Sequence, residues 1–173
     1  MLKIALNNGL IAGLIGVAIT LLASVTGFYD MSDDFQGEGS WYSSLVTAIS
    51  FAILIYFIIK SMKEYKNYVL EGMMSYWEAL KVGVLTGFVS ALVSAVFLLI
   101  YFSFIEPGLI AEIKENALYE LEEQNMGDQE YETAKSMMSW VMSPFVFAFT
   151  SLFSGTFIGL VISLITAAFQ KNK

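Results

Sequence analysis

The stretch VGVLTGFVSALVSAVFLLIYFSFI, residues 82–105, contains 24 consecutive residues without a charged side chain. A helix needs about 20 apolar residues to cross the roughly 30 Å hydrocarbon core of a bilayer. Because the backbone finds no water partners in that core, a crossing segment should be helical. Residues 82–105 therefore predict a transmembrane helix.

Three further charge-free stretches divide the chain in the same way, at residues 4–29, 39–59 and 136–170. The first two have the length of one crossing, but the last contains 35 residues and is too long for one. We expect its helix to begin at Pro144, because proline lacks an amide hydrogen and fits a first helical turn. A kinked helix that continues from the preceding loop is the alternative.

These stretches predict an all-α integral membrane four-helix bundle, a single domain over residues 1–173 with spans at about 4–28, 41–60, 80–104 and 144–169. Composition supports this class, since 57% of the 173 residues are hydrophobic, 14% are charged and the mean hydropathy is +0.66. An ordinary soluble domain carries about 25% charged residues. The chain has too few charges to cover a water-facing surface.

The sequence contains no His, no Cys and no Arg, and its net charge is −7. It therefore lacks thiolate and imidazole ligands, cysteine nucleophiles and histidine acid–base chemistry. No ionisable residue lies inside a predicted span away from its ends, whereas transporters and pumps usually bury one. We expect no catalytic residues, no metal site, no cofactor, no enzymatic activity and no nucleic-acid partner.

The lysines predict the orientation, because cytoplasmic loops carry an excess of basic residues. Seven of the nine lysines fall on one side of the predicted spans: Lys3, Lys60, Lys63, Lys66, Lys81, Lys171 and Lys173. Only Lys114 and Lys135 fall on the other. Both termini and the loop over residues 60–81 are therefore expected in the cytoplasm.

Between the third and fourth spans the chain is acidic and has helical periodicity. Pro107 suits a first turn, and apolar residues then share one helix face: Ile110, Ile113, Ala117, Leu118 and Leu121. Gly127 should end this helix and Asp128 should cap the next. Residues 107–138 therefore predict an extracytoplasmic hairpin of two amphipathic helices, folded against each other or lying on the membrane.

Acidic residues also cluster in the first outer loop, at Asp30, Asp33, Asp34 and Glu38. Clustered oxygens can bind calcium, but this spacing does not match the EF-hand pattern. We interpret the cluster as a solvated acidic face.

Each span carries small residues four apart, a spacing that lets helix backbones approach closely in a bilayer. The glycines of this kind are Gly9, Gly13, Gly83, Gly87, Gly155 and Gly159. Packing within the bundle is the favoured interpretation, and a homodimer face or a ligand groove is the alternative. Gly9 and Gly13 also align with Gly83 and Gly87 at an offset of 74 residues, which suggests a weak parallel repeat.

Local signals mark the start of the third span, where Ser75 and Glu78 form a capping-box pattern after a turn at Gly72. From residue 76 the sequence YWEALKVGVLTGFVSALVSAVFLLIYFSFIEPGL resembles a bacterial family known as domain of unknown function 4199. The resemblance covers nearly the whole chain, including the glycine-rich first span and Pro107. It implies a bacterial inner-membrane protein and assigns no activity.

The sequence thus favours a multi-pass membrane protein that acts by interaction, as a structural or accessory subunit. Its expected partners are the lipid bilayer and either a second copy or another membrane protein. The alternative is a small oligomeric transporter or a lipid-handling protein.

Overall fold

The computed structural model describes residues 1–27, 41–123 and 127–172, and no β-strand occurs in these ranges. In chain order the elements are α1 (Leu2–Val25), α3 (Trp41–Tyr68), α4 (Tyr76–Ile100), the π-helical turn η1 (Tyr101–Ile105), α5 (Pro107–Glu123), α6 (Asp128–Val141) and α7 (Pro144–Gln170). The predicted all-α class is confirmed. The acidic cluster of the first outer loop lies outside the described residues.

Within the described residues, four helices are long and apolar enough to cross a membrane: Leu2–Val25, Trp41–Tyr68, Tyr76–Ile105 and Pro144–Gln170. The chain is therefore an all-α integral membrane bundle. Its second span is longer than expected, because α3 continues beyond Lys60 to Tyr68. Lys60 and Glu64 lie one helical turn apart with Nζ and Oε1 separated by 3.8 Å, a spacing that supports a helix.

The capping signals at the third span are confirmed. The Ser75 hydroxyl accepts a hydrogen bond from the Glu78 amide at 3.4 Å, and Glu78 Oε2 accepts one from the Ser75 amide at 2.8 Å. Gly72 has a φ of +90°, a conformation that glycine adopts without a steric penalty. This turn and cap start α4 at Tyr76, four residues before the expected boundary.

At the fourth span, α6 ends at Val141 and α7 begins at Pro144, so the continuous kinked helix does not form. Ser143 caps α7 by accepting a hydrogen bond from the Val146 amide at 3.3 Å.

In the hairpin, the expected Asp128 cap was wrong. Gly127 occupies the N-cap position and Asp128 is already helical, so the helix starts one residue earlier than the cap prediction required.

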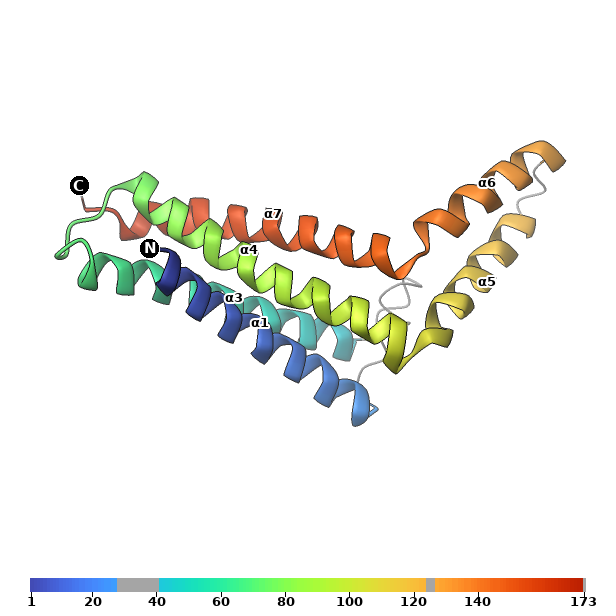
Figure 1. Ribbon diagram of the computed structural model, residues 1–173, viewed down its shortest axis with the longest axis horizontal. Helices are drawn as coiled ribbons and strands as arrows, with labels where there is room; N and C mark the ends of the chain where they lie inside the picture. The colour runs from blue at the N-terminus through green and yellow to red at the C-terminus, as the bar shows by residue number, and fades with distance from the viewer. Residues whose placement is uncertain (28–40, 124–126, 173) are drawn as a thin grey trace.

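Helix α4 is the centre of the bundle and packs against α1, α3 and α7 (Figure 1). The two termini and the turn between α3 and α4 lie together at one end, which we call the terminal end. The opposite end carries α5 and α6 and is called the hairpin end. Figure 1 shows α1 and α7 diverging from the terminal end toward the hairpin end. The two halves of the bundle are named after these ends.

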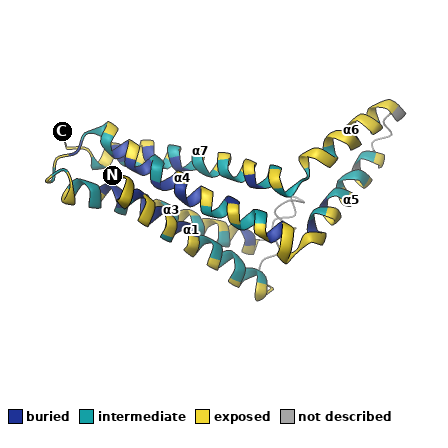
Figure 2. Ribbon diagram, viewed as in Figure 1, coloured by how far each residue is buried: buried dark blue, intermediate teal, exposed yellow. Residues whose placement is uncertain are grey.

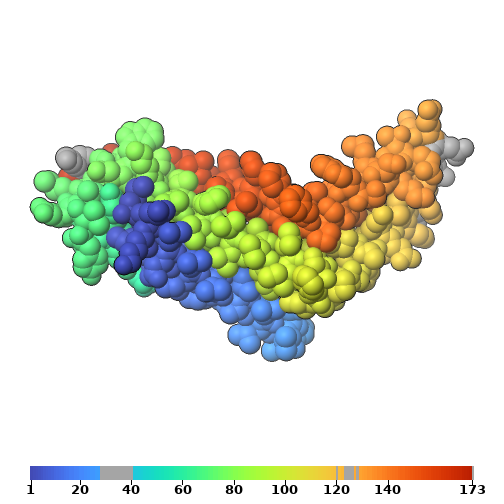
Figure 3. Space-filling model, viewed as in Figure 1, coloured from blue at the N-terminus to red at the C-terminus, as the bar shows by residue number. Residues whose placement is uncertain are grey.

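The predicted hairpin is confirmed, since α5 and α6 contact each other and project obliquely from the bundle (Figures 1 and 3). The hydroxyl of Tyr131 on α6 donates a hydrogen bond to Glu122 Oε1 on α5 at 2.8 Å. Of the expected apolar face, Ile113 is buried, together with Leu109, which was not among the predicted residues. Most of α6 is exposed (Figure 2).

A buried cluster fixes the base of the hairpin. It joins Tyr101 and Phe102 of the π-helical turn to Leu109 and Ile113 of α5. The Tyr101 hydroxyl donates a hydrogen bond of 2.6 Å to Glu106 Oε2, just before α5 begins. π-helical turns often occur at functional sites. Here the turn directs two aromatic rings under α5, so the hairpin leaves the bundle in a defined direction.

Candidate functional site: a cavity between the spans

Two glycines bring the backbones of α4 and α7 into contact. A Cβ atom on Gly159 would lie 2.9 Å from Gly87 Cα, and one on Gly87 would lie 2.8 Å from Gly159 Cα. Farther toward the hairpin end, a Cβ on Gly155 would lie 2.8 Å from Ala91 Cβ. Real Cβ atoms essentially never approach other atoms this closely. Any larger residue at these positions would therefore push the two helices apart.

The other three glycines predicted to pack also face helices of the same chain. A Cβ on Gly9 would lie 2.7 Å from the Thr86 carbonyl oxygen, and one on Gly13 would lie 2.6 Å from Val93 Cβ, both on α4. A Cβ on Gly83 would lie 2.5 Å from a serine hydroxyl of α7. All six predicted glycines thus lie at helix contacts within one chain. The stability that each glycine contributes stays a prediction. The internal repeat also stays a prediction.

In the terminal half, Asn8 joins α1 to α3. Its side chain is fully buried, and Nδ2 donates hydrogen bonds to Glu64 Oε2 at 2.6 Å and to the Ile4 carbonyl at 3.2 Å. Asn8 Oδ1 has no hydrogen-bond partner among the described residues. The charge pattern predicts Glu64 in the loop after the second span. The longer α3 corrects this, and brings one carboxylate against the buried surface of the bundle.

A cavity of about 240 Å³ opens between the spans. It lies between α1, α3, α4 and α7, from the middle of the spans into the hairpin half. Its lining residues are Ala12, Gly13, Gly16, Thr20, Val46, Thr47, Ser50, Phe51, Leu54, Ser90, Ser94, Gly155 and Ile158. Thr47 and Phe51 are also exposed on the surface, so the cavity reaches the surface beside α3. None of the described residues that line the cavity is charged.

The hydroxyl groups of the cavity fall into two classes. Three donate to the backbone of their own helix: Thr20 to Gly16, Ser50 to Val46 and Ser94 to Ser90, at 3.1, 2.9 and 3.3 Å. Their oxygens keep lone pairs that can accept a hydrogen bond. The Ser90 hydroxyl has no hydrogen-bond partner within the described ranges, although the residue is only 9% exposed. The cavity therefore offers both acceptors and one free donor.

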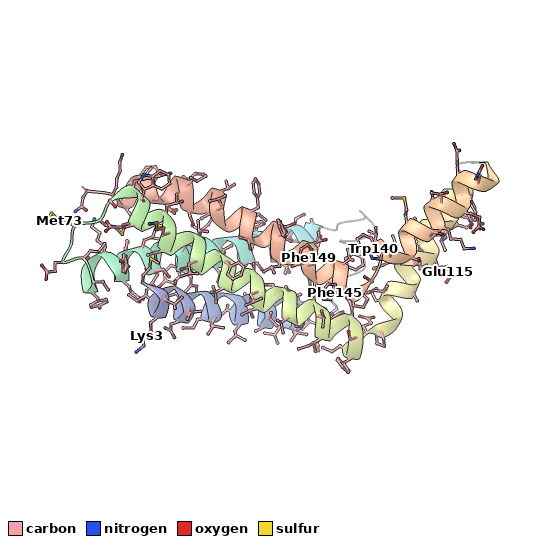
Figure 4. The ribbon with its side chains drawn as sticks, turned by 45° about the horizontal axis from the view of Figure 1, so that its top comes forward. Lys3, Met73, Glu115, Trp140, Phe145 and Phe149 are labelled. Carbon is pink, nitrogen blue, oxygen red and sulfur yellow. The ribbon has the colours of Figure 1, made fainter. Side chains whose placement is uncertain are left out.

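A different kind of surface lies on the outer side of α4 and α7. Two grooves of about 350 and 300 Å³ are lined almost entirely by apolar side chains and meet at Leu152. Phenylalanines spaced four residues apart run along α7 beside these grooves: Phe145, Phe149, Phe153 and Phe157. Figure 4 labels Phe145 and Phe149, which project from α7 near the hairpin. This face suits contact with lipid chains.

Among the described residues, no group of three or more acidic side chains lies close enough together to hold a metal ion. The hairpin carboxylates are spread along two helices, and Glu115, labelled in Figure 4, is exposed on α5. A calcium site in the first outer loop concerns residues outside the described ranges.

The family comparison matches residues 7–172 to the family described as protein of unknown function (DUF4199). The chain belongs to this family. The match reaches into all four apolar helices and includes the hairpin. The comparisons found no matching curated protein and no matching solved structure.

Proposed function

We propose that this DUF4199 protein is a non-enzymatic membrane protein that acts by interaction, as a structural or accessory subunit, with its hairpin as the contact surface. One observation carries this proposal: α6 leaves an apolar face uncovered. Met137, Trp140 and Val141 share one face of α6 and are 64%, 72% and 46% exposed. Figure 4 shows Trp140 beside the start of α7, where the hairpin leaves the bundle.

The buried base of the hairpin supports this role. Because Tyr101 and Phe102 fix α5 through Leu109 and Ile113, α6 presents its apolar face in a constant direction. A preformed surface loses less conformational entropy when it binds. A second copy of the chain or another membrane protein would cover the same face. The absence of histidine and cysteine from the sequence favours an interaction role over an enzymatic one.

The experiment places a photoreactive benzophenone amino acid at Met137 or Trp140 in living cells. The expected result is a discrete protein adduct after illumination, of twice the chain mass if the partner is a second copy. Ser139 is exposed on the opposite face of α6 and serves as the control position. Lipid adducts alone at Met137 and Trp140, or equal protein adducts at Ser139, would refute the role of this face.

The orientation belongs to the same proposal. Lys3, labelled in Figure 4, and the turn near Met73 lie at the terminal end, which carries most of the lysines. The positive-inside rule then places the terminal end in the cytoplasm and the hairpin outside the inner membrane. Reporter fusions at Asn67 and at residue 125 should report cytoplasmic and external positions respectively. The opposite pair of signals would reverse the topology.

A second candidate role, a lipid-handling protein or small transporter, is favoured by the cavity. The cavity lies at membrane depth and is lined from all four spans. In the terminal half, however, Ile58 and Met62 of α3 are fully buried in one cluster with Ala167 of α7. This packing favours a binding site over a continuous path for a solute.

A further inference from the structure

The position of the cavity restricts what can occupy it. Gly16 lies near the middle of α1 and Ser90 near the middle of the third span, so the cavity faces the hydrocarbon region of a bilayer. Since the described residues of its lining carry no charge, they offer nothing to compensate an ionic group, which is costly at this depth. Its occupant should therefore be uncharged and should arrive from the lipid.

The volume of the cavity suits one end of a ligand and not a whole lipid. Ligand pockets commonly measure about 300–1,000 Å³, and this cavity is somewhat smaller at about 240 Å³. It also reaches the surface at Thr47 and Phe51, where a longer chain could extend into the bilayer. A lipid could thus place one end inside the bundle and leave its tail among other lipid chains.

The hydroxyl groups of the cavity determine which chemical group that end of the ligand carries. Ser90 needs an acceptor, whereas the oxygens of Ser50 and Ser94 can only accept, because their hydrogens are donated to the backbone. A ligand hydroxyl donates one hydrogen bond and accepts others, so it satisfies both classes at once. A ketone, an ester or an ether would satisfy Ser90 alone, and a hydrocarbon would leave Ser90 unpaired in a largely apolar site.

We infer that the cavity binds the hydroxyl end of an uncharged lipid alcohol, with Ser90 as donor and either the Ser50 or the Ser94 oxygen as acceptor. This inference deepens the second candidate role. It does not depend on the partner proposed for α6, because the cavity and the exposed face of α6 share no residue.

The probe is a long-chain alcohol with a diazirine near its hydroxyl end, added to the full chain in lipid nanodiscs. Illumination should produce adducts within residues 12–20 or 46–54. Unlabelled tetradecanol should compete about tenfold better than tetradecane, the ratio expected for one or two hydrogen bonds, and its methyl ether should fall between them. Equal competition by the alkane, or adducts confined to the phenylalanine face of α7, would overturn the inference.

Gly16→Leu fills the cavity without disturbing the helix contacts, because a Cβ on Gly16 would meet nothing within 4 Å. Leucine is also a better helix former than glycine. The variant should melt no lower than the parent protein and should lose at least nine-tenths of the labelling. Ala18→Leu is the control on the exposed face of α1 and should keep it. Unchanged labelling of Gly16→Leu would overturn the inference.

Ser90→Ala tests the donor with little change in volume. It should weaken competition by tetradecanol about three- to tenfold and leave competition by tetradecane unchanged, as expected for the loss of one hydrogen bond. If both competitors keep their parent potency in this variant, the hydroxyl does not recognise the ligand and the inference is wrong. The α6 cross-linking result does not affect either outcome.

Discussion

The two halves of the bundle are built from the same apolar residues but are packed differently. In the terminal half, Gly87 meets Gly159 and Asn8 bonds to Glu64, so the spans are joined by close contacts and hydrogen bonds. In the hairpin half, the same four spans leave a cavity of about 240 Å³. Because lipid and side chains are equally apolar, packing and not hydrophobicity decides where the helices close.

The ends of the chain reinforce this difference. Asn172 donates its backbone amide to the Met74 carbonyl at 3.1 Å and accepts a hydrogen bond from the Met74 amide at 2.9 Å. Its side chain also donates to the Gly72 carbonyl at 2.8 Å. These bonds hold the chain after α7 against the turn between α3 and α4. The terminal half is thus closed at its end, whereas at the hairpin end a buried cluster of described residues fixes the base of α5.

The largest expected effect comes from placing the same side chain in both halves. Gly159→Leu would drive a side chain into the α4 backbone at Gly87, and overpacking of this kind costs about 3 kcal/mol, or roughly 6–12 °C in melting temperature for a chain of this size. Gly16→Leu enters the cavity and should cause no loss. Thermal unfolding of both variants in mild detergent measures the contrast. Similar melting temperatures for the two variants would remove the proposed difference between the halves.

Sequence patterns could predict the spans because charge is expensive in hydrocarbon. The charge-free stretches locate all four apolar helices, and Ser75, Glu78 and Pro144 mark two of their starts through local capping chemistry. The end of α3 was missed because the Lys60–Glu64 spacing fits either a solvated loop or a continuing helix. Only tertiary packing against α1 decides between them.

The cavity could not be predicted, because a missing contact leaves no pattern in one helix. Gly16 and Gly13 look alike in the sequence, yet a Cβ on Gly13 would meet Val93 and one on Gly16 would meet nothing. The difference arises because the spans diverge toward the hairpin end. The sequence also does not predict that the Ser90 hydroxyl lacks a hydrogen-bond partner, because serines in spans usually bond to the backbone of their own helix.

A smaller effect is expected from the buried amide of the terminal half. Asn8→Asp would place a second carboxylate beside Glu64 and should cost about 2 kcal/mol near neutral pH, since two negative charges would share one site. Acid protonates one of them, so the loss should be present at about pH 8 and largely recovered at about pH 5.

Asn7→Asp is the matched control, because Asn7 is the neighbouring residue and is exposed. Its melting temperature should depend on pH as that of the parent protein does. The measurement is thermal unfolding of the three proteins at both pH values. A pH-independent loss in Asn8→Asp would indicate that Glu64 is fully hydrated and that the terminal half is less tightly closed than the hydrogen bond implies.

The smallest effect lies in the hairpin, which is held by solvent-accessible contacts beyond its base. The hydrogen bond from Tyr131 to Glu122 raises the pKa of Tyr131 above its ordinary value, and partial burial and the negative charges of Glu122 and Glu132 act in the same direction. The neutral phenol is thus favoured in the folded hairpin. This contact is fully present below the ordinary tyrosine pKa and is lost as the pH rises through the raised value.

Difference absorbance titration of the parent protein against Tyr131→Phe isolates this one phenol among nine tyrosines. Glu122→Gln removes the nearest charge and should return the Tyr131 pKa toward its ordinary value, while the melting temperature of the bundle stays unchanged. That combination would show that the two hairpin helices are held together independently of the packed spans. If Glu122→Gln instead lowered the melting temperature of the bundle, the hairpin and the spans would unfold as one cooperative unit. The hairpin would then not be a separately folded part of the molecule.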